Sequence, residues 1–151
     1  MTTAAGISHT TVSTSQLAPL GFELEVPTAN AGMKVYIYVE NDSGAALIIN
    51  RMQTRKAGSA TYQVAQSGAA NPVTAVGVAE IAIPNGSFGF LLRKGHGVVD
   101  SAATVNANLG LILIAGGEVV HAAAVTGAAC GNTLAGRTGA GTFTAFINCQ
   151  G

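Results

Sequence analysis

Charged side chains are scarce in this sequence. They make up 9% of its 151 residues, against about 25% in ordinary soluble domains. Seven lysines and arginines balance seven aspartates and glutamates, so the formal net charge is zero. Without an excess of positive charge, binding to nucleic-acid phosphates is not expected. A chain with so little charge tends to self-associate, so we expect an obligate oligomer or a component of a larger assembly.

Long hydrophobic runs are missing as well, although 48% of the residues are hydrophobic and the mean hydropathy is +0.41. The longest apolar run, residues 109–115, contains Gly110 and is far shorter than the ~20 residues that span a bilayer as a helix. The first 16 residues have neither a basic nor an apolar region of the kind found in signal peptides. We therefore expect neither a membrane span nor a secretory signal.

Cysteine is limited to Cys130 and Cys149, and tryptophan does not occur. Two cysteines form no disulfide framework, and their spacing matches no zinc or redox motif. Cys149 continues the alternation of Phe143, Ala145 and Ile147, which predicts a small buried side chain. A bond between the two cysteines stays open. Their low number favours maturation in a reducing cytoplasm.

Residues that carry chemistry are few. Of the three histidines, only His96 has polar neighbours that suggest a triad, Asp100 and Ser101. No nucleophile motif accompanies them. No His, Cys or carboxylate cluster has the spacing of metal ligands, and no glycine-rich phosphate loop occurs. We expect a protein that is not an enzyme, with no catalytic residue, no metal and no cofactor.

Residues 1–18 are rich in Thr, Ser and Ala and show neither helical nor strand periodicity. They predict a flexible N-terminal arm, either disordered or ordered only against a partner, with Thr10 and Thr11 as candidate contacts. Residues 19–151 are predicted to form one β-domain.

Alternating or short apolar segments recur every 8–12 residues from there on, and no segment has a helical period. This spacing predicts a mainly β fold, a single-domain antiparallel β-barrel or β-sandwich. The expected strands are residues 20–26, 33–40, 45–53, 60–66, 73–83, 88–94, 96–101, 109–114, 118–123 and 142–149.

The stretch from Val73 to Val99 is expected to be a central hairpin. Asn85-Gly86 is a strong signal for a two-residue type I′ turn. Such a turn would place Ile83 opposite Phe88.

The other face of this hairpin would bring Ala82 opposite Gly89, with Glu80 diagonal to Arg93. Small residues in such positions allow close approach of another backbone. Ala82, Gly89 and Arg93 are therefore candidate contacts with another subunit, and a Gly89→Trp change is expected to disrupt assembly more than the monomer.

Residues 33–40 are predicted to place Tyr36 and Tyr38 on the face opposite Val35, Ile37 and Val39. Tyrosine is enriched at interfaces, because it combines apolar area with a polar tip. Tyr36 and Tyr38 are therefore candidate oligomer or capsid contacts. With Tyr62 they offer an alternative, a platform on which a glycan stacks.

The sequence around Ile83–Phe90, GVAEIAIPNGSFGFLLRKG, resembles small structural proteins of tailed bacteriophages, most of all capsid decoration (cement) proteins. VYIYVENDSGAAL upstream and residues 136–148 downstream extend the resemblance over residues 33–149. The resemblance implies a virion protein on the capsid surface, assembled in the bacterial cytoplasm. It further implies a homo-oligomer, commonly a trimer at threefold or quasi-threefold positions, whose partner is the major capsid protein. Another virion component, in the tail or the capsid shell, is the alternative, together with the glycan-binding barrel.

Overall fold

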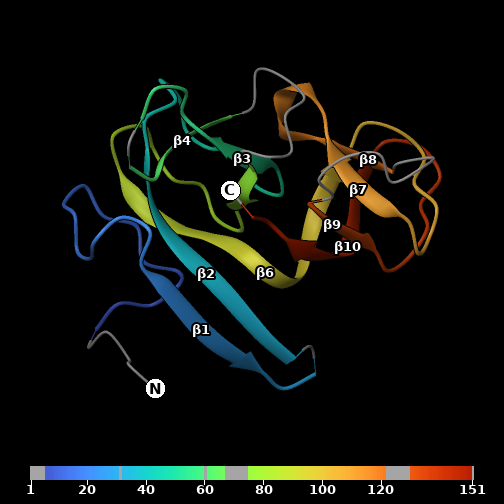
Figure 1. Ribbon diagram of the computed structural model, residues 1–151, viewed down its shortest axis with the longest axis horizontal. Helices are drawn as coiled ribbons and strands as arrows, with labels where there is room; N and C mark the ends of the chain where they lie inside the picture. Colours follow the sequence, from blue (N-terminus) through green and yellow to red (C-terminus); the bar gives the residue numbers. More distant parts are fainter. Residues whose placement is uncertain (1–5, 31, 60, 67–74, 122–129, 151) are drawn as a thin grey trace.

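The computed structural model describes residues 6–30, 32–59, 61–66, 75–121 and 130–150, and these are built almost wholly from strands (Figure 1). The predicted mainly β class is confirmed. No helix among these residues has the length and apolar character needed to cross a membrane. The elements are β1 (Glu23–Thr28), β2 (Gly32–Asn41), β3 (Met52–Arg55), β4 (Gln63–Gln66), β5 (Ala75–Val78), β6 (Phe88–Ser101), β7 (Gly110–Leu113), the short 3₁₀ helix η2 (Ala115–Gly117), β8 (Val119–His121), β9 (Gly131–Thr133) and β10 (Gly141–Asn148).

Strand pairing among the described residues closes on itself twice. The first circuit runs β2–β4–β3–β5–β6 and returns to β2. The second runs β6–β10–β9–β7–β8 and returns to β6 through the pair Ser101 and Val119. Most pairs are antiparallel, but β2–β4 and β6–β8 are parallel. β6 therefore belongs to both circuits, and β1 extends the first one as an edge strand on β2.

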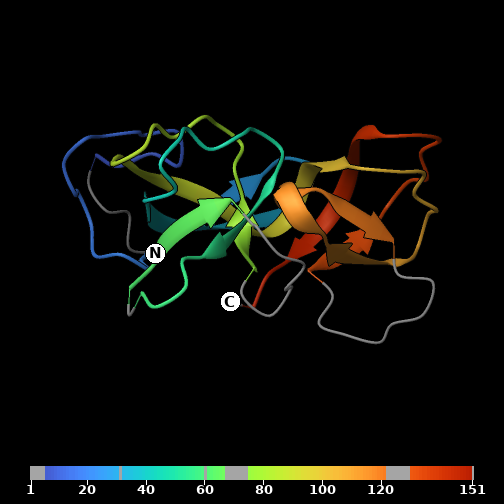
Figure 2. The ribbon, with the colours of Figure 1, turned by 90° about the horizontal axis from the view of Figure 1, so that it is seen from above.

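The two circuits lie side by side along the long axis, and β6 crosses from one to the other (Figures 1 and 2). Two strands are predicted here, residues 88–94 and 96–101 with a break at Gly95, whereas β6 continues through all 14 residues. Gly95 lies against the backbone of β2, where a Cβ would be 3.0 Å from the Met33 carbonyl oxygen. Glycine at such a position permits close backbone approach and a bend within the strand, so Gly95 shapes β6 instead of ending it.

Two hydrophobic clusters follow from the alternation of side chains along β2. Ile37 and Val39 point into the first circuit and join a cluster with Leu47, Val64, Val76, Ala79, Ile83 and Leu91. Tyr36 and Tyr38 point the other way, into a larger cluster that continues through Leu92 and Met52 into the second circuit. Both faces of β2 are therefore buried from Tyr36 to Val39, whereas Met33 at its start is exposed.

The predicted hairpin about Asn85-Gly86 is wrong. A turn does form, since the Ser87 amide donates to the Pro84 carbonyl at 3.1 Å. Gly86 has φ 72°, but Asn85 has no positive φ, which excludes type I′. After β5 the chain leaves the sheet, and Phe88 pairs with Glu40 of β2 instead of Ile83.

Other strand boundaries also differ from the sequence analysis. Residues 45–51 form a loop and not a strand; Asn50 there adopts the left-handed conformation with φ 64°. β1 continues through Pro27, which an edge strand tolerates because the missing N–H faces away from the ladder. β9 lies between the expected strands 118–123 and 142–149, where no strand is predicted. The strands expected at 33–40, 60–66, 109–114, 118–123 and 142–149 are confirmed within their described residues as β2, β4, β7, β8 and β10.

Candidate functional site

The N-terminal segment, residues 6–18, lies beside β2 and the start of β6 (Figure 1). Ser13 and Phe88 form an isolated antiparallel bridge: the Ser13 amide donates to the Phe88 carbonyl at 3.1 Å, and the Phe88 amide donates back at 2.8 Å. The Leu17 amide donates to the Tyr38 hydroxyl at 3.0 Å. The His9 and Tyr36 rings lie 4.7 Å apart. The described part of the predicted arm thus contacts its own chain, and the division at residue 18 stays a prediction.

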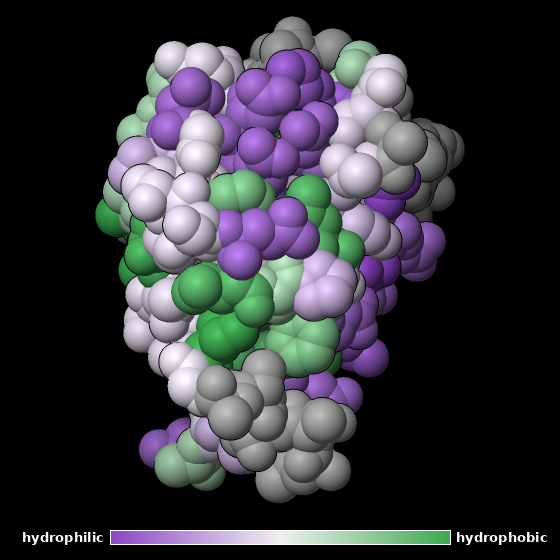
Figure 3. Space-filling model, turned by 90° about the vertical axis from the view of Figure 1, so that its left-hand side faces the viewer, coloured by the Kyte–Doolittle hydropathy of each residue, from purple (hydrophilic) through white to green (hydrophobic). Residues whose placement is uncertain are grey.

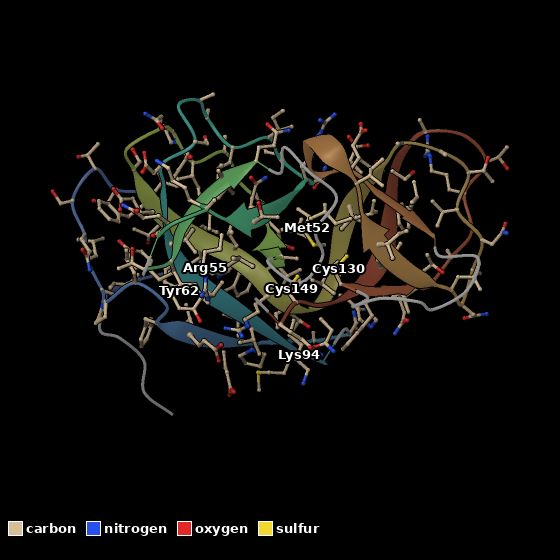
Figure 4. All side chains as sticks on the ribbon, turned by 45° about the horizontal axis from the view of Figure 1, so that its top comes forward. Met52, Arg55, Tyr62, Lys94, Cys130 and Cys149 are labelled. Carbon is tan, nitrogen blue, oxygen red and sulfur yellow. The ribbon has the colours of Figure 1, made fainter. Side chains whose placement is uncertain are left out.

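Tyr36 and Tyr38 were expected on an exposed face, but they are 2% and 0% exposed. The Tyr36 hydroxyl donates to Glu80 Oε2 at 2.6 Å, and Lys34 Nζ lies 2.8 Å from Glu80 Oε1. Burial, followed by the hydrogen bond and the charge of Glu80, raises the pKa of Tyr36 above its ordinary value. Tyr62 is half-buried beneath the Arg55 guanidinium, 4.5 Å from its ring centroid (Figure 4). The three tyrosines therefore form no exposed stacking platform for a glycan.

The backbone carbonyl of Thr11 lies close to Gly89. A Cβ at Gly89 would lie 2.7 Å from Ile83 Cδ1 and 3.6 Å from the Thr11 carbonyl oxygen. Gly89 is buried against Ile83 and Thr11 of its own chain. A Gly89→Trp change would therefore disrupt the monomer itself, contrary to the expectation from the sequence. Thr10 is exposed on the segment and shares a hydrogen bond with Ser8. Of the seven predicted interface residues, Tyr36 and Tyr38 contact the segment on one face of the sheet, and Gly89 contacts Thr11 on the other.

The N-terminal segment also presents apolar side chains outward. Val12 is 38% exposed and Leu17 is 47% exposed. Figure 3 views the side of the molecule on which the segment lies, and apolar surface gathers there between polar regions. The segment therefore contacts the sheet on one side and exposes two apolar side chains among polar ones on the other.

Ala82 lies apart from Gly89, in a loop that is exposed at Ala82. We call residues 43–50 and 80–87 the paired loops, because Asn41 ties them together. The Asn41 Nδ2 donates to the Ala45 and Ile83 carbonyls, both at 2.7 Å, and its Oδ1 accepts from the Ser43 amide. Asn41 is 0% exposed. A single buried amide therefore fixes both loops at one end of the first circuit.

The exposed part of the paired loops is apolar. Ile48 and Ile49 are 45% and 46% exposed, beside exposed alanines at 45, 46 and 82. Residues 43–50 and 81–87 carry no charged side chain. Leu47 is buried and its amide donates to the Ile83 carbonyl at 3.0 Å, which anchors the loop from within. Sequence reasoning missed this surface because it assigned the apolar run 47–49 to a strand, although that run does not alternate with polar residues.

Arg93 lies on a different face. It pairs with Glu23 of β1 at 2.7 Å, while Glu80 pairs with Lys34, so the expected proximity of Glu80 and Arg93 is wrong. Beside this pair is a shallow cavity of about 430 Å³ between β1, β2, β6 and the end of β10. Its lining mixes both signs of charge with amides: Glu23, Glu25, Val35, Arg93, Lys94, Asn148, Cys149 and Gln150.

Both cysteines are free thiols and buried, so the expectation that Cys149 is a small buried side chain is confirmed. Cys149 Sγ lies 3.6 Å from Met52 Sδ and 4.0 Å from the Cys130 carbonyl oxygen (Figure 4). Burial raises the pKa of Cys130 to about 12 and that of Cys149 further. Such thiols stay protonated and inert at neutral pH.

The structure gathers no metal-ligating cluster of three or more His, Cys, Asp or Glu among the residues it describes. His96 makes an edge-on ring contact with Phe146, 5.8 Å between centroids. Ser101, the hydroxyl of the suggested triad, instead donates to the carbonyls of Ala103 and Gly141. These contacts are structural, and no nucleophile–base pair is formed.

No protein-family model matches the sequence, and no curated protein is similar to it. Among solved structures, the fold is similar to the crystal structure of the "head fiber gp8.5 N base in bacteriophage phi29". The TM-score is 0.58 at 13% sequence identity, over 75% of this chain and 94% of the other. At this identity the likeness shows a shared fold.

Proposed function

We propose that this chain is a non-enzymatic structural protein of a tailed-bacteriophage virion that decorates the outside of the head and stabilises it. The observation that carries the proposal is the shared fold with the base of a phage head fibre, over nearly the whole of that base. The low charge of the sequence supports it, because a surface with few charges favours permanent contacts with other subunits.

The paired loops are the surface that we assign to the capsid. They present Ile48 and Ile49, and their only charged side chain, Glu80, is paired with Lys34. Asn41 holds them in place before any partner arrives. A preorganised apolar surface loses little conformational entropy on binding. Repeated over a symmetric shell, modest contacts of this kind give strong overall attachment.

The protein is expected to act as a homo-oligomer, a trimer at threefold or quasi-threefold positions, with the major capsid protein as its partner. Oligomerisation multiplies the number of paired loops that engage the shell at once. No catalytic step and no cofactor is part of this role.

The location is tested by immunogold electron microscopy of intact particles with antibodies against the purified chain. Gold on the heads supports the proposal. Gold confined to tails supports the alternative of a tail component, and gold that appears only after heads are opened supports a capsid-shell or internal position. Particles without gold would contradict a virion role altogether.

The assigned surface is tested with heads that lack the chain. Purified protein is mixed with them and sedimented, and the bound fraction is compared between the native chain and an Ile48→Asp/Ile49→Asp variant. We expect the variant to bind at least ~10-fold more weakly, about 1.4 kcal/mol. Lys94→Gln, at the mixed-charge cavity on another face, is the matched control and should bind like the native chain.

A further inference from the structure

The N-terminal segment is held by a small set of contacts, at the start of β6 and on the face of β2 that carries Tyr36 and Tyr38. They comprise the Ser13–Phe88 bridge, the Leu17 to Tyr38 hydrogen bond and the His9–Tyr36 ring contact. Ile7 packs against the same hydrophobic cluster. Each of the bridge, the hydrogen bond and the ring contact joins one residue of the segment to one residue of β2 or β6. The segment therefore docks as a unit.

The connection between segment and domain is a short turn. The Phe22 amide donates to the Pro19 carbonyl at 3.1 Å, and Gly21 has φ 86° with its Cα against the Tyr62 ring. From Gly21 onward the chain is part of the sheet, since the Gly21 amide donates to the Tyr38 carbonyl at 2.8 Å. A rotation within residues 18–20 would therefore redirect the whole segment without disturbing β1.

We propose that the N-terminal segment is exchanged between copies of this chain, so that residues 6–18 of one copy occupy the β2–β6 face of a neighbour. Exchange preserves every contact of the docked segment, because the donor is an identical chain. Val12 and Leu17, 38% and 47% exposed on the docked segment, would become buried where the two exchanging copies pack against each other. Residues 6–18 contain no Lys, Arg, Asp or Glu, so no charge opposes their approach to a second copy.

This inference does not depend on the virion role, since it concerns contacts between copies of this chain. Exchange would reconcile the burial of Tyr36 and Tyr38, and the half-burial of Thr11, with their predicted role as oligomer contacts. In the exchanged form, the same buried side chains lie at the boundary between two chains.

A Ser13→Cys/Phe88→Cys variant tests the exchange directly. The two positions form a hydrogen-bonded antiparallel pair, whose Cα separation of about 5.5 Å suits a disulfide. After mild oxidation of the two new thiols by oxidised glutathione, exchange gives covalent dimers or trimers on a non-reducing gel. A monomer band with an internal bond would overturn the proposal. Ser13→Cys alone and Phe88→Cys alone are the controls and should not form the ladder.

A second measurement leaves Phe88 intact. Ile7, which packs against the hydrophobic cluster of the domain, is replaced by the photoreactive residue benzoylphenylalanine in both light and ¹⁵N-labelled chains, which are unfolded together, refolded and irradiated. Mass spectrometry then reads the crosslinked peptide pairs between the segment and β2 or β6. Pairs of one light and one heavy peptide support exchange. Pairs of equal mass alone would show that each segment stays on its own domain and would refute it.

Discussion

Leu92 contacts two glycines, Gly77 through its backbone and Gly97 through its side chain. This difference predicts different costs for adding a methyl group at the two positions. A Cβ at Gly77 would lie 2.7 Å from the Leu92 carbonyl oxygen and 2.9 Å from Leu91 Cβ, both parts of the chain that cannot turn away. At Gly97 the nearest atom is Leu92 Cδ2, the far end of a side chain. Neither glycine has a positive φ, so only space distinguishes them.

We predict that Gly77→Ala lowers the free energy of unfolding by about 1–3 kcal/mol, in the range of overpacked cores. Gly97→Ala should cost less, because Leu92 can change its side-chain rotamer. Urea unfolding of the two variants beside the native chain measures both values. Equal losses, or a larger loss at Gly97, would contradict the packing around β5 and β6.

The two thiols make a prediction about alkaline pH. Burial raises the pKa of Cys130 from an ordinary value of 9.0 to about 12, and it raises that of Cys149 as well. Between these values the unfolded chain loses thiol protons that the folded chain keeps, so stability falls as the pH rises above 9. Below that pH the contribution is fully present.

Unfolding free energies measured on both sides of pH 9 should therefore show a decline that a Cys130→Ala/Cys149→Ala variant loses in part. The remainder should come from Tyr36, whose pKa is also raised. Ellman's reagent should react with neither thiol in the native chain and with both in denaturant. Rapid labelling of the folded protein would show that the thiols are accessible.

At the scale of elements, the paired loops depend on one side chain. Asn41 supplies two donors and one acceptor to backbone groups of both loops from a fully buried position. Its own backbone adds two more bonds, from its amide to the Ser87 carbonyl and from the Gly86 amide to its carbonyl. Asn41 therefore holds the loops in place together with direct bonds between them, such as that from the Leu47 amide to the Ile83 carbonyl, and strand pairing does not.

We predict that Asn41→Ala lowers the unfolding free energy by about 1–3 kcal/mol, the usual cost of leaving buried polar groups unpaired. Asn41→Asp should be worse at neutral pH, since a carboxylate would face the carbonyl oxygens of Ala45 and Ile83. Lowering the pH should restore part of the loss in the Asp variant only, because protonation supplies a donor. Thermal unfolding at neutral and acidic pH distinguishes the two. An Asp variant as stable as the native chain would refute the assigned amide orientation.

The elements that sequence reasoning found are those whose burial alternates. β10 is the clearest case: Phe143, Ala145 and Ile147 are buried between exposed threonines at 142 and 144, as the pattern predicts. The paired loops were missed because the apolar run 47–49 has no periodic pattern. The loops are held by the buried side-chain amide of Asn41, which a local pattern does not reveal. The turn at Asn85-Gly86 was found but its pairing was wrong, because Asn41 and Ser13, far away in the sequence, take the hydrogen bonds of residues 86–88.

The interface residues followed the same rule. Tyr36 and Tyr38 were placed on the correct face of β2, since alternation decides the face. Their burial could not be predicted, because it comes from contacts with residues 6–22. Residues 6–18 show no strand period, so the sequence did not indicate that they pack on β2. Local pattern decides orientation, and long-range pairing decides exposure.

At the scale of the whole molecule, a shared β6 joins two closed circuits of strands, so that few unpaired strand edges remain among the described residues. β1 is an open edge, and it carries Pro27 and exposed glutamates, features that discourage pairing with other strands. Association through sheet edges is thereby disfavoured there. Two places where the described residues offer apolar side chains to partners are the N-terminal segment, with Val12 and Leu17, and the paired loops, with Ile48 and Ile49.

These two surfaces should separate by mutation, because they lie on different elements and have different proposed partners. A Val12→Asp/Leu17→Asp variant places charge on the segment, where exchange would bury it, so it should lower the oligomer mass measured by light scattering. Ile48→Asp/Ile49→Asp should leave that mass unchanged and weaken binding to heads. Thr10→Asp, an exposed polar position on the same segment, controls for added charge. If the loop variant dissociated the oligomer while the segment variant left it intact, the two surfaces would have the opposite roles, and both assignments would be wrong.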